Sequence, residues 1–88
     1  PPLLSKALED FNRAVKAHPA DINAMYNRSI AKAMLGDLRG AHADLNRAIA
    51  ITPTDPMLYE QRGKVSAAMS RPKLALKDFG TALLMETL

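Results

Sequence analysis

The chain has 88 residues, of which 48% are hydrophobic and 24% are charged, so it is expected to fold as one small domain rather than remain disordered. Twelve Lys and Arg outweigh nine acidic residues to give a net charge of +3. These charges are scattered along the chain without a basic block, which argues against nucleic acid as the partner. The absence of cysteine excludes disulfides and thiolate metal sites and favours the cytoplasm over secretion.

No apolar run approaches the roughly 20 residues that a membrane-spanning helix needs, so we expect no membrane partner. The N-terminus also lacks the basic and apolar regions of a signal peptide. The chain begins at Pro1 without a methionine, and we therefore expect it to be part of a longer protein.

The first predicted element is an amphipathic helix from about Leu3 to Lys16. Its apolar residues follow the i, i+3, i+4, i+7 spacing of one helix face, and polar residues take the other side. The helix should end at His18, because the residue before Pro19 is pushed out of helical geometry. Asp21 can then cap the next helix.

Two further helices are predicted on either side of Gly36. The second spans residues 22–35 and is closed by this glycine, which adopts a left-handed conformation without penalty. Asp37 then caps a third helix over residues 38–51, and Pro53 stops it. Because so few residues separate these helices, they must fold back on each other as an antiparallel hairpin.

A fourth helix is predicted to start at Asp55 and Pro56, a capping side chain followed by proline at the first helical position, and to run to about Met69. The segment 70–72, Ser-Arg-Pro, repeats this logic and predicts that Ser70 introduces a fifth helix. No sustained period-two alternation is present, so no strand is expected.

The third helix has counterparts at one constant spacing in both directions along the chain. Its Ala41, Leu45, Ala48 and Pro53 are matched one period earlier by Ala7, Phe11, Ala14 and Pro19, and the first three are matched one period later by Ala75, Phe79 and Ala82. A fixed period with small and large apolar residues in phase indicates a helical repeat array.

This pattern resembles the tetratricopeptide repeat (TPR), a helix-turn-helix unit of about 34 residues with the signature W-x2-L-G-x2-Y, then A-x3-F, then P. The second half of the signature matches three times, at the residues just given. The first half matches less well: Met25, Arg28, Ser29 and Lys32 stand where the signature has Trp, Leu, Gly and Tyr, and Tyr59, Arg62, Gly63 and Ser66 stand there one repeat later. The small Ser29 and Gly63 suit close helix contact, and we expect Arg28 and Lys32 to lay their stems over apolar surface.

The resemblance implies an all-α, right-handed α-α superhelix of five antiparallel helices in a single domain over residues 1–88. The expected division is a half repeat over residues 1–21, a repeat over residues 22–55 and a repeat over residues 56–88. Helices that would cover the two ends are absent from this count, so both ends should show apolar surface.

The function that the resemblance implies is a protein-protein interaction scaffold, which holds a peptide or helix of a partner in a concave groove lined by the first helix of each repeat. Asn27 is the sharpest candidate, because an amide both donates and accepts hydrogen bonds. The residues expected to face the groove are Asn23, Tyr26, Asn27, Ile30, Ala33 and Met34 from the second helix, and Met57, Glu60, Gln61, Lys64 and Ala68 from the fourth.

One subgroup of the family grips the C-terminal carboxylate of chaperones with Lys, Asn and Arg. Here Met57 and Gln61 occupy places where Lys and Arg would be needed, which disfavours that ligand. No catalytic, cofactor or metal site is expected: His18 and His42 lack partners at ligand spacing, and Asp10, Asp44 and Asp78 recur once per repeat, about 10 Å apart, which is too far for a catalytic pair. We therefore predict that the chain is not an enzyme.

Two alternatives remain from the sequence. The first is a homo-oligomer, in which the last helix of one copy, with Leu76, Phe79, Leu83 and Leu84, stacks on the first helix of another. The second is RNA binding by a related helical-repeat family, which the charge of +3 permits. The Ala, Phe, Ala and Pro positions match the protein-binding family better.

Overall fold

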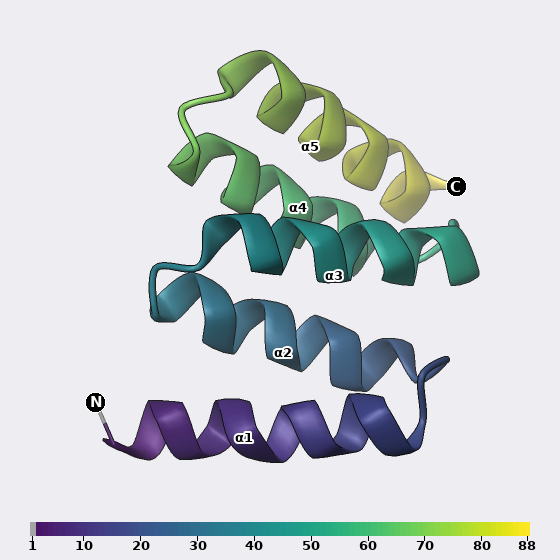
Figure 1. Ribbon diagram of the computed structural model, residues 1–88. Coiled ribbons are helices and arrows are strands. Elements are labelled where there is room, and N and C mark those ends of the chain that lie inside the picture. Colours follow the sequence, from purple (N-terminus) through teal and green to yellow (C-terminus); the bar gives the residue numbers. More distant parts are fainter. Residues whose placement is uncertain (1) are drawn as a thin grey trace.

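A computed structural model describes residues 2–88, and this part of the chain contains five α-helices and no strand. The helices are α1 (Pro2–Ala17), α2 (Ile22–Met34), α3 (Leu38–Ile51), α4 (Pro56–Ala68) and α5 (Pro72–Thr87). Each helix runs antiparallel to the next and packs beside it, so the chain is a stack in sequence order (Figure 1). The predicted all-α superhelical architecture is confirmed.

The turn between α2 and α3 has the chemistry expected of Gly36 and Asp37. Gly36 has a φ of +89°, in the left-handed region. The N–H of Asp37 reaches back to the Lys32 carbonyl at 2.8 Å, and the Asp37 carboxylate accepts from the Gly40 N–H at 2.9 Å. The turn therefore closes one helix and caps the next within two residues. The expected caps at Asp21 and Asp55 are also present.

The turn between α4 and α5 has the same backbone path but different residues, and it corrects the prediction for Ser70. Ser70 has a φ of +60° and occupies the left-handed position that Gly36 holds one repeat earlier. The N–H of Arg71 reaches back to the Ser66 carbonyl at 2.9 Å. Arg71, rather than Ser70, is the cap residue of α5, and its side chain makes no capping hydrogen bond. The prediction for Ser70 was wrong because this tight turn needs a residue in the left-handed conformation immediately before the cap residue.

The core lies between α2, α3 and α4, and it is built on the repeated small residues. Its buried members are Met25, Ala41, Leu45, Ala48, Leu58 and Val65. Ala41 and Ala48 are fully buried, which allows neighbouring helices to approach closely. Gly63 serves the same purpose in the second repeat, since a Cβ added there would lie 2.6 Å from the ring of Phe79. The expectation of a close helix contact is confirmed for Gly63, and Ser29 is fully buried.

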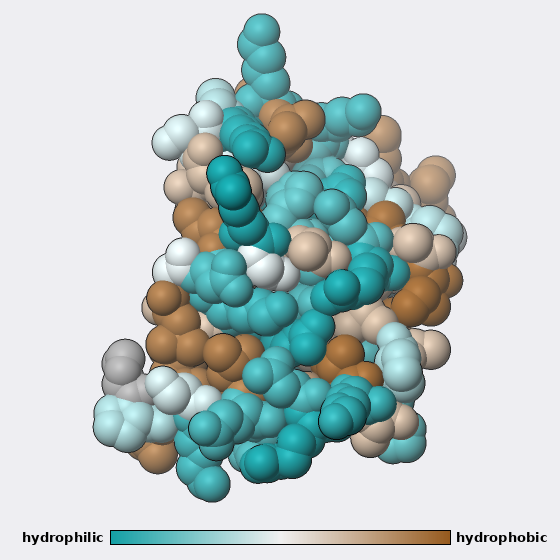
Figure 2. Space-filling view, in the orientation of Figure 1, coloured by the Kyte–Doolittle hydropathy of each residue, from teal (hydrophilic) through white to brown (hydrophobic). Residues whose placement is uncertain are grey.

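Apolar side chains are exposed at the two ends of the stack. On α5, the exposed fraction is 70% for Leu76 and 62% for Leu83, and Leu3 on α1 is 84% exposed. Figure 2 shows hydrophilic side chains across the middle of one face, with hydrophobic ones gathered toward its edges. No helix within residues 2–88 combines the length and apolar character that crossing a membrane would require.

Candidate functional site

A shallow hollow of about 220 Å³ lies between α2 and α4 and includes the first residue of α3. Its lining consists of Ala33, Met34, Leu38, Gln61, Lys64, Val65 and Ala68. Five of these seven are residues that the sequence placed in the groove. Leu38 and Val65 were not predicted, because both belong to apolar stripes that face the core. The floor is apolar, and the polar groups come from Gln61 and Lys64 of α4.

The remaining predicted groove residues do not line this hollow. Asn23 and Asn27 are exposed on α2, and Met57 is 52% exposed near the start of α4. Tyr26 and Ile30 are half-buried, and Tyr26 packs against the core. A binding role for these five positions stays a prediction.

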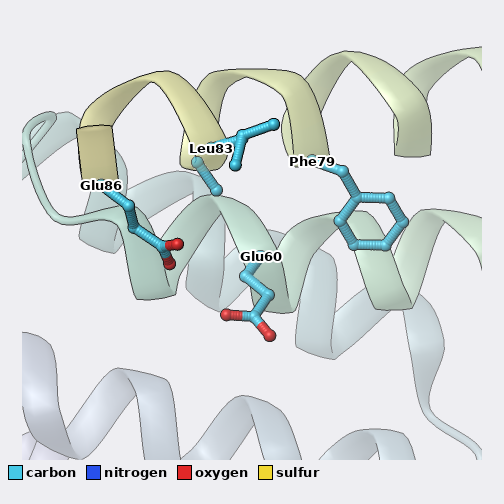
Figure 3. A pocket seen from close by; sticks show the side chains of 5 residues that line it. Glu60, Phe79, Leu83 and Glu86 are labelled. Atoms are coloured by element: carbon cyan, nitrogen blue, oxygen red, sulfur yellow. The ribbon is translucent and has the colours of Figure 1, made fainter. Parts of the chain in front are cut away.

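Glu60 lies between two surfaces. Its carboxylate is 3.7 Å from the Nζ atom of Lys64, which lines the hollow between α2 and α4. Glu60 itself lines a second hollow, formed by α4 and α5, that also contains Phe79, Ala82, Leu83 and Glu86 (Figure 3). The structure therefore separates Glu60 from the hollow lined by Met34, Gln61 and Lys64.

The most heavily bonded polar group is one to which the sequence gave no specific partner: the buried carboxylate of Asp44. Arg28 donates to it twice, from Nε at 2.8 Å and from Nη2 at 2.5 Å. The Nζ of Lys32 lies 3.2 Å away, and Arg47 also donates to this carboxylate. Arg28 and Lys32 thus form ion pairs with Asp44, a role for their head groups that the sequence did not predict.

The same arrangement recurs one repeat later. Arg62 donates from Nε and Nη2 to Asp78, both at 2.8 Å, and from Nη1 to the side-chain oxygen of Asn46 at 3.0 Å. Arg28 likewise reaches Asn12 at 3.3 Å. Each arginine therefore joins its own helix to the two second helices that flank it. The signal was present in the sequence, because Arg28 and Arg62, Asp44 and Asp78, and Asn12 and Asn46 are each separated by one repeat.

The charges of this network keep Asp44 ionised. Burial alone raises the pKa of the Asp44 carboxyl, but the hydrogen bond from Arg28 and the charges of Lys32 and Arg28 outweigh it, so the pKa lies below its ordinary value. The same hydrogen bond raises the pKa of Arg28. A carboxylate whose oxygens are occupied by three cationic side chains acts as a structural group. Among residues 2–88, no cluster of three His, Cys, Asp or Glu has the spacing to hold a metal ion.

No protein-family model matches the chain. Tetratricopeptide repeat protein 36 of Bos taurus is 37% identical over 83 residues, which make up 90% of this chain and 44% of that protein. The first TPR of Spaghetti (RPAP3), solved with the HSP90 peptide SRMEEVD, has a TM-score of 0.90 at 25% identity and covers 96% of this chain and 67% of that one. The chain is a tetratricopeptide repeat array.

Two further relatives define how far this likeness extends. The TPR fold is shared with a MamA structure, with a TM-score of 0.89 at 18% identity, over 96% of this chain and 48% of that one. FK506-binding protein-like of Rattus norvegicus is 37% identical over 59 residues, which are 67% of this chain and 17% of that protein. The chain thus spans less than half the length of the two curated relatives named here.

Against the TPR signature, the ion pairs mark the chief departure of this chain. Arg28 stands at the leucine position of the signature and Lys32 at the tyrosine position, and both turn onto Asp44. In the next repeat, Arg62 pairs with Asp78, but Ser66 takes the tyrosine position. The Ser66 hydroxyl is buried and has no hydrogen-bond partner in the described part of the chain. Both helix pairs thus contain the same ion-pair clamp, an arginine of the first helix bound to a buried aspartate of the second. Asp44 has two further cationic partners, Lys32 and Arg47, and Asp78 is paired with Arg62.

Proposed function

We propose that this TPR array is a non-catalytic, cytoplasmic interaction scaffold that holds a peptide or helix of a partner protein in the groove between α2 and α4. The observation that carries the proposal is the hollow in which Met34, Gln61 and Lys64 meet over an apolar floor. Such a surface suits one apolar anchor side chain, with an amide and an ammonium group to orient the ligand. On this proposal the groove is built by the repeats over residues 22–55 and 56–88.

Support for a peptide ligand comes from the two TPR domains of Spaghetti that are solved with the HSP90 peptide SRMEEVD. The lining of the groove in this chain supports a different kind of peptide. Lys64 shares its charge with Glu60, and Gln61 is uncharged. We therefore propose a ligand with an apolar anchor rather than an acidic tail.

The test is a fluorescence polarisation titration with two peptides: one selected on the chain from a displayed peptide library, and SRMEEVD. Replacing Met34, Gln61 or Lys64 with alanine should weaken binding of the selected peptide, by roughly ten-fold for at least one of them, because a few residues carry most of the affinity at such sites. The control is Lys77→Ala, which removes the same charge from an exposed position of α5 and should change nothing.

Unchanged affinity in all three variants would show that the peptide binds on another face of the molecule. Tighter binding of SRMEEVD than of the selected peptide, with loss on Lys64→Ala, would replace the apolar anchor by carboxylate recognition. In either case the fold and the ion-pair network would stand.

A further inference from the structure

A third hollow, of about 460 Å³, lies where the turn between α2 and α3 adjoins the turn between α4 and α5, and we call it the turn hollow. Figure 1 shows both turns at the same edge of the stack. The lining residues come from both turns: Gly36, Asp37, Leu38, Arg39, Met69 and Arg71. The walls of the turn hollow are therefore supplied by two consecutive repeats.

Two of the six arginines of the chain line the turn hollow, and they differ from the other four in their partners. The other four each form an ion pair with an aspartate: Arg13, Arg28, Arg47 and Arg62. Arg39 and Arg71 are exposed, and within residues 2–88 neither forms an ion pair. The turn hollow thus gathers the two guanidinium groups whose charge the described part of the chain leaves unpaired.

The one acidic residue of the lining has a different task. The Asp37 carboxylate accepts from the Gly40 N–H at 2.9 Å and caps α3, where it offsets the partial positive charge of the helix N-terminus. A Cβ at position 40 would overlap this carboxylate, so glycine lets it fold back in this way. Two guanidinium groups against one capping carboxylate leave the turn hollow positive, and a positive hollow attracts an anionic group.

Arg71 has a second reason to attract an anion. It is the cap residue of α5, and its side chain gives that helix no capping hydrogen bond. A cation at the start of a helix is opposed by the helix dipole. A carboxylate paired with Arg71 would neutralise this charge and place a negative group near the N-terminus of α5, where negative charge is favourable.

The turn hollow adjoins the groove between α2 and α4. Leu38 lines both of them, and Ala68 of the groove is followed directly by Met69 of the turn hollow. An extended peptide advances about 3.3 Å per residue, so side chains a few positions apart can reach two adjoining hollows. A peptide that leaves the groove at this end would therefore pass the two arginines.

We propose that Arg39 and Arg71 bind an acidic side chain of the peptide whose apolar anchor lies in the groove. The partner is then recognised by an apolar residue together with an Asp or Glu a few positions away. This inference rests on the function proposed for the groove and adds the chemistry of a second ligand residue. Guanidinium groups suit the task because they donate paired N–H groups to a carboxylate. Lys64 suits it less, because its Nζ atom lies 3.7 Å from the carboxylate of Glu60.

The probes are the peptide selected on the chain from a displayed library and a twin in which each Asp and Glu is replaced by Asn or Gln. Fluorescence polarisation at low salt should show roughly ten-fold tighter binding of the acidic form, and added salt should reduce the difference. The double variant Arg39→Gln, Arg71→Gln should reduce the preference to within about two-fold, because the two charges are its source. The matched control is Arg13→Gln, which removes an exposed arginine of α1 and should leave the preference unchanged.

Met34→Ala separates this proposal from the one on which it rests. It should weaken the acidic peptide and its twin by the same factor, because it removes a contact of the anchor alone. Weaker binding in Met34→Ala without any acid preference would refute the role of the turn hollow and leave the groove intact. An acid preference that the arginine double variant abolishes, with unchanged binding in Met34→Ala, would support the turn hollow and refute the groove.

Three further outcomes would overturn the proposal. The first is a selected peptide that contains no acidic residue. The second is an acid preference that survives in Arg39→Gln, Arg71→Gln and disappears in Lys64→Ala. The third is tighter binding of single-stranded oligouridine than of the acidic peptide, lost in the arginine double variant, which would assign the two arginines to nucleic-acid phosphates.

Discussion

The helix pairs α2–α3 and α4–α5 are joined by turns with the same hydrogen-bond pattern and a left-handed residue at the same place, but the residues of the two turns differ. In the first, Gly36 and Asp37 form the turn, and three cationic side chains surround Asp44. In the second, the equivalent turn is made by Ser70 and Arg71, and Arg62 is the one cationic group within 4 Å of Asp78 among the described residues. The turn residues of α4–α5 therefore fit this geometry less well than those of α2–α3, and the buried carboxylate there has fewer ion pairs. The second repeat should therefore be the weaker one.

The largest expected effect is on the ion-pair clamps. Arg62→Ala leaves the buried Asp78 without its partner and should lower the free energy of unfolding by about 3 kcal/mol. Arg28→Ala should cost less, about 1–2 kcal/mol, because Lys32 and Arg47 still neutralise Asp44. Urea denaturation followed by circular dichroism measures both.

Arg39→Ala is a suitable control for this comparison, since it removes an exposed arginine outside the clamps. An equal loss in Arg28→Ala and Arg62→Ala would show that the additional cations around Asp44 contribute nothing.

The second effect concerns the left-handed residue of each turn. Ser70→Gly should raise the free energy of unfolding by about 1 kcal/mol, because it relieves a φ of +60° that glycine adopts without penalty. Gly36→Ser, the reverse exchange at the equivalent position, should lower it by a similar amount. Thermal unfolding of the two variants gives the comparison, and a shift of the same sign in both would contradict it.

The third effect concerns the helix caps and is of similar or smaller size. Arg71→Asp should supply α5 with the cap that Asp37 gives α3, and it should stabilise the chain by up to about 1 kcal/mol. Arg71→Asn supplies a capping oxygen without adding a negative charge, so it tests the cap alone. Asp37→Ala removes the cap of α3 and should lower the free energy of unfolding by a similar amount. If Arg71→Asn lowered the denaturation midpoint, the missing side-chain cap of α5 could not be a cause of lower stability in the α4–α5 pair.

The smallest effect is a pH dependence at position 42, where the other repeats have Leu8 and Leu76. Burial, and then the charges of Arg62 and Arg71, lower the pKa of His42, while Asp78 opposes them. The unfolded chain therefore binds this proton more readily, and stability should fall as the pH drops below 6.5, the ordinary value, toward the lower pKa of the folded state. In His42→Leu, the melting temperature should change less with pH over this range. An unchanged slope would exclude His42 as its source.

The sequence predicted most of the fold because the determinants of each helix are local. Asp21, Asp37 and Asp55 act within three residues of their own position, and the constant repeat period set the stacking order. Ser70 was misassigned because its role depends on a turn geometry that the packing of α4 and α5 imposes. The pairs of Arg28 with Asp44 and Arg62 with Asp78 span 16 residues across two helices, so no local rule identifies them.

The candidate sites were harder to predict than the helices. The sequence placed Met34, Gln61 and Lys64 on one side of their helices, and the structure brings them together. It could not place Glu60 on the rim of a separate hollow, because that hollow exists only where α5 leaves Phe79 and Leu83 uncovered. Which apolar residues stay open depends on what packs over them, and periodicity alone does not contain that information.

We expect the third hydrogen bond of each arginine, to Asn12 or Asn46, to couple the unfolding of neighbouring helices. Arg28 holds Asn12 of α1 while it holds Asp44 of α3, so fraying of α1 breaks a bond to the same guanidinium group that orders the next repeat. Native-state hydrogen exchange in α1 and α3 should consequently respond together to Asn12→Ala, although α1 contains no fully buried residue. The bond to Asn46 extends this cooperativity to α4, and it ends at Gly80, where α5 has no side chain to continue it.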